Sequence, residues 1–390
     1  MHLDHTPEQK ELRREFRAYL NKLMTPERRA KIGRGEGGGE YKATIRQLGE
    51  DGWLTPGWPV EYGGRGFDSM AQKIVLEELV LAEAPFPFVT VNTIGPALIR
   101  LGSDEQKKLF LPRIAKGEII FAIGYTEPSA GTDLAHLKTR AVLDGDHYVV
   151  NGNKIFTSGA EGADYVWLAC RTDPDAKPHK GISILIMDTK VKGFSVSPII
   201  TVGGIRTNVT YYEDVHIPAN MVVGEVNGGW RLITEQLNHE RVGLSVLTYA
   251  GQGCFDEVVT WAKATPAGSG KVIDQPWVQE TLGKAYALLA AYSTMGNRVA
   301  WEVSQGRIGP AYASAAKVFG TESLIEVYRL LLDVVGPQGI VKQHSPGALL
   351  HGKLERGYRE CQINTFGGGV AEVMRDMVAQ FGMGLPRIAR

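Results

Sequence analysis

The chain has 390 residues, of which 43% are hydrophobic and 22% charged, a composition typical of globular proteins and a length that suits two or three domains. Lysine plus arginine equals aspartate plus glutamate at 43 each, which argues against nucleic acid or an anionic membrane as the main partner. The three cysteines form no C-x-x-C pair and the nine histidines show no metal-ligand spacing. We therefore expect reduced thiols, no metal site and a cytoplasmic location.

Helices are expected over residues 1–120, which we assign to an N-terminal helical domain. Thr6 and Gln9 form a capping-box pattern at the start of the first helix, and Ser103 with Gln106 repeats that pattern further along. The N-terminal stretch is charged throughout, unlike a secretory signal, and no run of about 18 apolar residues predicts a membrane span.

The hydrophobic period changes twice along the remaining chain. Runs of β-branched and aromatic residues broken by turn residues fill 121–225 and predict an antiparallel, barrel-like middle domain. The alanine-rich segments 281–303 and 311–335 are apolar on most faces, which is typical of helices buried in a bundle. We assign 226–390 to a C-terminal four-helix bundle, so the predicted fold is mainly α with a central β domain.

One carboxylate interrupts an apolar helical seam. In the predicted helix 228–263, Glu240 follows Leu237 by three residues and precedes Leu244 by four, so it shares their face. Loss of hydration there raises the pKa of a carboxyl group, which suits a general base. The alternative is a structural carboxylate paired with an arginine such as Arg241.

A second candidate is the turn GYTEPSAGTD at residues 124–133. Pro128 and Gly131 predict a sharp turn with Thr126 and Thr132 on either side, where backbone N–H groups and hydroxyls could hold the polar edge of a cofactor. An ordinary turn is the alternative.

A third candidate is NGNKIFTSGA at residues 151–160. We interpret Asn151–Gly152 as a hairpin turn leading into a strand that ends at Phe156 and Ser158. An aromatic ring beside hydroxyls suits a flat heterocycle, although Phe156 could instead be a cross-strand packing residue. No Walker motif, no G-x-G-x-x-G after a strand and no G-x-S-x-G elbow is present.

Taken together, these segments resemble the acyl-CoA dehydrogenase family over almost the whole chain. That family combines a helical N-domain, a central β domain and a C-terminal four-helix bundle. Its motifs occur here in family order as WPVEYGGRGF (58–67), GSDEQKKLFLPRIAKGE (102–118), YTEPSAGTDLAHLKTRA (125–141), NGNKIFTSGAEGADYVWLAC (151–170), VGEVNGGWRLI (223–233) and GLPR (384–387).

The resemblance implies FAD as cofactor and the conversion of an acyl-CoA to its trans-2-enoyl-CoA, with electron-transfer flavoprotein as the acceptor. A carboxylate removes the α-proton while the β-hydride passes to the flavin. By the same resemblance, Tyr125 and Thr126 meet the pyrimidine edge of the flavin, Phe156 packs on its ring, Ser158 lies near N5, Thr132 contacts the cofactor and the CoA arm, and Arg241 lies near the thioester.

The family's usual catalytic loop is altered in the stretch INTFGGGVAEVMR at residues 363–375. Gly367 and Gly368 stand where most members have tyrosine and the catalytic glutamate, and we expect both glycines to border the flavin. A minority of members carry the base in a helix-borne Glu-Arg pair, which here is Glu240–Arg241. The loss of two side chains leaves room for a bulky or branched acyl group, and the chain is similar in this respect to actinobacterial steroid side-chain dehydrogenase subunits of cholesterol catabolism.

The segments that clamp a neighbour's FAD adenylate in homotetrameric members also differ. Residues 265–284 lack the expected arginine, Asp333 replaces a glutamine, Pro337 a glycine and Val370 a threonine. A lost guanidinium–pyrophosphate contact is worth roughly 1.5–3 kcal/mol. We therefore expect a hetero-oligomer in which a second dehydrogenase-like chain supplies the clamp. A flavin oxidase or monooxygenase on the same fold, and a non-catalytic partner subunit, are the alternatives.

Overall fold

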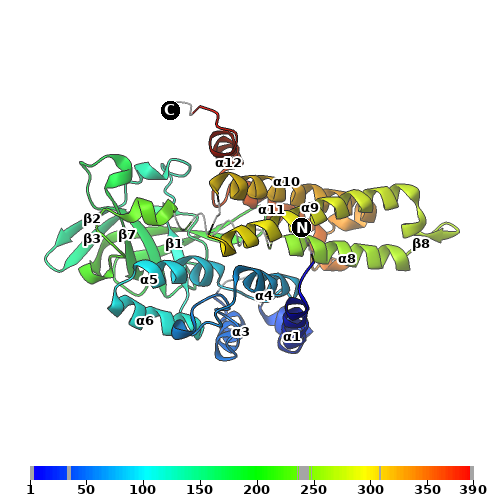
Figure 1. The fold of residues 1–390 in the computed structure, drawn as a ribbon, viewed down its shortest axis with the longest axis horizontal. Helices are drawn as coiled ribbons and strands as arrows, with labels where there is room; N and C mark the ends of the chain where they lie inside the picture. Colours follow the sequence, from blue (N-terminus) through cyan, green and yellow to red (C-terminus); the bar gives the residue numbers. More distant parts are fainter. Residues whose placement is uncertain are drawn as a thin grey trace.

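The computed structural model describes residues 4–32, 37–234, 236, 246, 248–306 and 309–386. It confirms the predicted fold class, with helices at both ends of the chain and a β domain between them. The molecule is elongated, with the β domain at one end and the long C-terminal helices at the other (Figure 1). The N-terminal helices run along one side of both parts.

The N-terminal helices are α1 (Pro7–Leu23), α2 (Pro26–Ile32), α3 (Gly39–Glu50), α4 (Ser69–Leu81), α5 (Gly95–Leu101) and α6 (Asp104–Ala115), with a π-helix η2 (Val89–Ile94) before α5. Helices α1 and α6 begin at the caps that the sequence predicts. The Thr6 hydroxyl accepts a hydrogen bond from the Gln9 amide at 3.3 Å, and the Gln9 side chain accepts one from the Thr6 amide at 3.1 Å. Ser103 and Gln106 form the same pair of bonds, both at 3.2 Å.

Seven strands form one sheet in the middle of the chain: β1 (Phe121–Gly124), β2 (Arg140–Asp144), β3 (His147–Ile155), β4 (Tyr165–Arg171), β5 (Ile182–Asp188), β6 (Phe194–Ile200) and β7 (Arg206–Pro218). The order is β1-β4-β2-β3-β7-β6, with β5 paired to β4. The pairings are antiparallel, as expected, except that β4 runs parallel to β1 and to β2. Parallel pairing needs a long connection, and some 40 residues separate β1 from β4.

The predicted hairpin turn at Asn151–Gly152 is wrong, because both residues lie inside β3. The register of β3 against β7 shifts between Val150 and Gly152, which marks a β-bulge. A side chain at Gly152 would lie 2.5 Å from the Thr139 hydroxyl oxygen. Glycine is therefore required at this point because another segment approaches the strand closely.

The sheet is buried on both faces in its centre. Alternate residues of β4 and β5 pack into two different cores, as the two-residue period of a strand dictates. Trp167, Ala169, Ile182, Ile184 and Ile186 join a core shared with the N-terminal helices. Val166, Leu168, Cys170, Leu185 and Met187 join the core on the opposite face.

The C-terminal helices are α8 (Thr248–Ala264), α9 (Pro276–Ser304), α10 (Pro310–Val335), α11 (Lys353–Cys361) and α12 (Ala371–Met377), with a small hairpin of β8 (Pro266–Ala267) and β9 (Gly270–Lys271) after α8. Helix α10 is central and packs against the other four. Gly251 of α8 faces Leu324 and Leu289. Helices α8 and α9 also pack against α4, which joins the bundle to the N-terminal helices.

The domain boundaries at residues 120 and 225 stay predictions, and the core under the N-terminal helices continues across the first of them. Among the described helices, none has both the length and the apolar character needed to cross a bilayer. No group of described histidine, cysteine and acidic residues has a metal-binding arrangement.

Candidate active site

The turn after β1 is held by a buried ion pair that the sequence analysis missed. The Glu127 carboxylate accepts hydrogen bonds from the backbone amides of Lys138 and Thr139, at 2.6 and 2.8 Å, and from Lys154 Nζ at 2.9 Å. Lys154 is fully buried and also donates to the Tyr125 carbonyl at 3.0 Å. Burial opposes ionisation of Glu127, but the Lys154 ammonium and these donors lower its pKa below the usual value. The only sequence signal was a lysine at an inward-facing strand position.

This turn lies beside the end of β3. The Ile155 amide donates to the Thr126 carbonyl at 2.8 Å, which joins the second and third candidate segments. Glu127 and Ala130 exchange backbone hydrogen bonds of 3.0 and 3.1 Å, and these close a tight turn. Thr132 lies on its exposed side.

Phe156 is not a cross-strand packing residue. It follows the last residue of β3, its backbone φ of 62° lies in the left-handed region, and 59% of its surface is exposed. An exposed aromatic ring held by such backbone is uncommon and points to a ligand-facing role. Beside it, the Ser158 hydroxyl lies 2.9 Å from that of Thr207, and both strand ends therefore present polar groups.

Sequence reasoning also missed Gln236. The Trp167 indole nitrogen donates to the Tyr125 hydroxyl at 3.0 Å, and that hydroxyl donates to Gln236 Oε1. Gln236 is separated from Tyr125 by 111 residues. No local pattern predicts a contact over such a separation.

The turn before α12, formed by Gly367, Gly368 and Gly369 and called the glycine turn below, requires glycine at two of its three positions because of the backbone conformation there. Gly368 and Gly369 have φ values of 66° and 116°, which side-chain-bearing residues rarely adopt. Gly367 has no such requirement, and its amide donates to the Ile363 carbonyl at 2.7 Å. The buried Lys317 holds the turn by donating to the Gly369 carbonyl.

The glycine turn and the strand ends lie on connected elements. Helix α11, which precedes the turn, reaches the β6–β7 loop, where the Arg359 guanidinium donates to the Val202 carbonyl. The backbone of Glu360 lies 3.2 Å from where a side chain at Gly203 would begin. Thr207, the partner of Ser158, is the second residue of β7 after this loop.

Glu240 and Arg241 lie outside the described residues, so their predicted roles stay predictions. On either side of them, Ile233 and Val246 are buried in the core that the N-terminal helices share with the sheet. Residues 229–234 are helical, in agreement with the start of the predicted helix.

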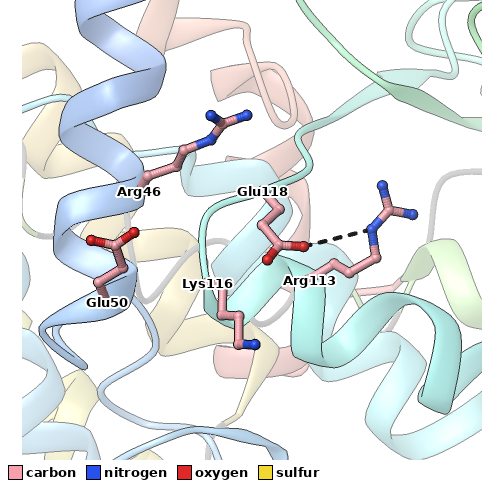
Figure 2. Close-up of a pocket in the computed structure, with 5 residues that line it drawn as sticks. All are labelled: Arg46, Glu50, Arg113, Lys116 and Glu118. Atoms are coloured by element: carbon pink, nitrogen blue, oxygen red, sulfur yellow. Dashed lines mark ion pairs between the residues drawn. The ribbon is translucent and has the colours of Figure 1, made fainter.

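Two hollows on the described surface lie away from the predicted site residues. One is formed by Arg46 and Glu50 of α3 with Arg113, Lys116 and Glu118 at the end of α6 (Figure 2). The Arg113 and Glu118 side chains are 3.9 Å apart there. Charged, exposed side chains surround this hollow, and none of the predicted site residues does. A second hollow lies along α8 beside Leu350 and likewise contains none of them.

The residues around Tyr125 and Phe156 fit a flat, polar-edged ring system. Phe156 offers an exposed aromatic face, and the two strand ends offer hydroxyls. Two polar atoms within this region, Asn208 Oδ1 and Gln236 Nε2, are buried and have no hydrogen-bond partner among the described residues. The Asn208 amide is fixed by its bond to the Thr157 carbonyl at 3.0 Å. Buried polar atoms without partners are rare in proteins, and a bound molecule that supplies the partner is one explanation for them.

Known proteins share this architecture over the whole chain. The acyl-CoA dehydrogenase FadE26 of Mycobacterium tuberculosis is 50% identical over 405 residues, which cover 100% of both chains. The chain belongs to the acyl-CoA dehydrogenase family. The family's N-terminal, middle and C-terminal domain models match residues 6–118, 122–215 and 227–383. The chain is therefore an oxidoreductase, and its cofactor is FAD.

Two solved structures are similar to this acyl-CoA dehydrogenase over their full lengths. The Tcur3481–Tcur3483 steroid acyl-CoA dehydrogenase is 50% identical with a TM-score of 0.95, and each chain is covered completely. The ChsE4–ChsE5 complex of Mycobacterium tuberculosis is 51% identical with a TM-score of 0.94, again with complete coverage of both chains.

Proposed function

We propose that this acyl-CoA dehydrogenase introduces a trans-α,β double bond into the CoA thioester of a bulky or branched acyl group of the steroid side-chain type, with electron-transfer flavoprotein as acceptor. The observation that carries the proposal is the 50% identity, over the complete chain, to a steroid acyl-CoA dehydrogenase. The side-chain-free turn at Gly367 and Gly368 supports it, since most family members are expected to have two side chains at these positions. A cytoplasmic location is part of the proposal and is supported by three free, buried cysteines.

In this proposal Glu240 takes the α-proton of the thioester, and Arg241 lies near the CoA end of the substrate. Bound FAD supplies the two-electron acceptor for the β-hydride. Tyr125 and Thr126 hold the pyrimidine edge through a turn that the Glu127–Lys154 pair makes rigid. The Phe156 ring packs on the flavin.

The remaining proposed contacts come from both sides of the site. Ser158 and the glycine turn border the reactive ring, and Thr132 reaches the CoA arm from the exposed side of its turn. A rigid, preorganised frame of this kind would hold the substrate and the flavin close together in a fixed orientation.

Glu240→Gln tests the base. We expect kcat to fall by about 10²–10⁴-fold, the range for a lost general base, while the flavin absorbance spectrum stays unchanged. The assay uses the purified protein complex and a panel of straight, branched and steroid side-chain acyl-CoAs. The exposed Glu225→Gln is the matched control and should retain full activity.

Normal turnover by the Glu240→Gln variant would remove this residue from the mechanism. A strong preference of the unmodified protein for butyryl-CoA or octanoyl-CoA would overturn the assignment of a bulky substrate instead. Stoichiometric peroxide formation would contradict electron-transfer flavoprotein as the acceptor.

A further inference from the structure

The hydrogen bonds around Tyr125 fix the orientation of the Gln236 side chain. An indole nitrogen can only donate, so the Tyr125 hydroxyl accepts from Trp167 and has its own proton left to donate. That proton goes to Gln236 Oε1. The amide oxygen of Gln236 is therefore directed at Tyr125, and its NH₂ group is the atom left to face another acceptor.

No such acceptor exists among the described residues. Gln236 is 2% exposed, and its Nε2 atom has no hydrogen-bond partner there. A buried donor without a partner destabilises the folded protein, because the group has lost its water and gained nothing in return. A bound molecule that supplies an acceptor removes this cost.

A second buried glutamine shows the contrasting case. Gln106 Nε2 donates to the carbonyls of Asn220 and Val222, both at 2.8 Å, and its oxygen accepts from the Ser103 amide. Its hydrogen bonds are made within the protein, as expected of a structural residue. Gln236 differs because its Nε2 atom donates to no described residue.

The position of that donor relates it to the proposed site. Tyr125 is the proposed contact for the flavin edge, and Gln236 precedes the proposed base Glu240 by four residues. We propose that Gln236 Nε2 donates a hydrogen bond to an acceptor atom of the bound ligand and is a specificity-determining residue of this dehydrogenase. The acceptor is a carbonyl-type oxygen, which both the flavin pyrimidine ring and an oxygenated acyl group carry. This inference rests on the proposed function.

Gln236→Met tests the proposal, because methionine keeps the length of the side chain and removes the donor. Gln106→Met is the matched control, which should lower the melting temperature without changing any ligand parameter. Flavin content, flavin reduction potential and the dissociation constant of FAD report on an acceptor in the cofactor. The ratio of KM values for two acyl-CoAs that differ by one oxygen reports on an acceptor in the substrate.

We expect Gln236→Met to change either the dissociation constant of FAD or the KM ratio by about 3–10-fold, which is the effect of one neutral hydrogen bond. Tyr125→Phe keeps the aromatic ring and removes the hydroxyl that orients the Gln236 amide. It should change the same set of values, and it is the second test if Gln236→Met does not fold. A change in the cofactor set identifies the flavin as the acceptor, and a change in the KM ratio identifies the acyl group.

Unchanged values in both sets for a folded, active variant would overturn the inference and indicate that Nε2 binds only a buried water. Absence of dehydrogenase activity or FAD from the unmodified protein complex would overturn the proposed function instead. The two failures are therefore distinguishable.

Discussion

At the scale of single residues, the Glu127–Lys154 pair determines how firmly the proposed flavin turn is held. Both side chains are buried, and Lys154 also holds the Tyr125 carbonyl. Burial lowers the pKa of Lys154, although the Glu127 carboxylate opposes that shift. Removal of one of the two side chains would leave the other as an unpaired buried charge. That change destabilises the folded protein much more than replacing both side chains together.

We expect Lys154→Met to lower the free energy of unfolding by about 3–5 kcal/mol, measured by urea denaturation. Lys138→Met is the control, because its exposed side chain takes no part in the pair and only its backbone amide binds Glu127. Its effect should stay within about 0.5 kcal/mol. An equal, small effect of both changes would show that the ion pair does not stabilise the turn.

The same pair predicts a pH dependence. The pKa of Glu127 in the folded chain lies below its ordinary value of 4.5, so the unfolded chain takes up the proton first as the pH falls. The stability from this group is therefore complete above its ordinary pKa and is lost as the pH falls toward the folded pKa. The loss should be absent in a Glu127→Gln variant, which provides the check.

At the scale of helices and strands, the sequence correctly predicted the features that depend on a few neighbouring residues. The capping boxes at Thr6 and Ser103 are confirmed because each needs only four consecutive residues. The bulge at Gly152 was misread, because a glycine inside a strand and one in a turn look the same until the register against β7 is known. The links from Tyr125 to Gln236 and from Glu127 to Lys154 were missed because the fold alone brings these residues together.

Helices α9 and α10 approach so closely that a glycine is required between them. A side-chain carbon at Gly320 would lie 2.0 Å from the Tyr292 ring, while one at Gly283 would meet nothing within 4 Å. We expect Gly320→Ala to lower the melting temperature through overpacking worth about 1–3 kcal/mol. Gly283→Ala, on an exposed helix face, should raise the melting temperature, because it adds about 0.5–1 kcal/mol to the free energy of unfolding. A neutral Gly320→Ala would contradict the close packing of these helices.

At the scale of the whole molecule, the proposal of a second, different chain rests on residues that differ from those expected to clamp a neighbour's FAD. Asp333 at the end of α10 pairs with Arg329 at 2.9 Å, so this guanidinium is already engaged by an acid. Pro337, in the 3-10 turn that follows α10, lacks an amide proton with which to hold a phosphate. The similarity to the ChsE4–ChsE5 complex supports a hetero-oligomer.

We expect the chain expressed alone to bind little FAD, because its own copies cannot complete the adenylate site. Co-expression with a second dehydrogenase-like chain that carries the missing clamp residues should yield one complex with fewer flavins than subunits, measured by flavin absorbance and by mass in solution. Asp333→Gln, which removes one negative charge near the clamp, should raise FAD retention in the isolated chain. The exposed Glu322→Gln on the same helix should not, because Glu322 pairs with Arg375 and not with Arg329. A stable homotetramer holding one FAD per chain would contradict the proposal, because the charges at the end of α10 would then be compatible with a bound pyrophosphate.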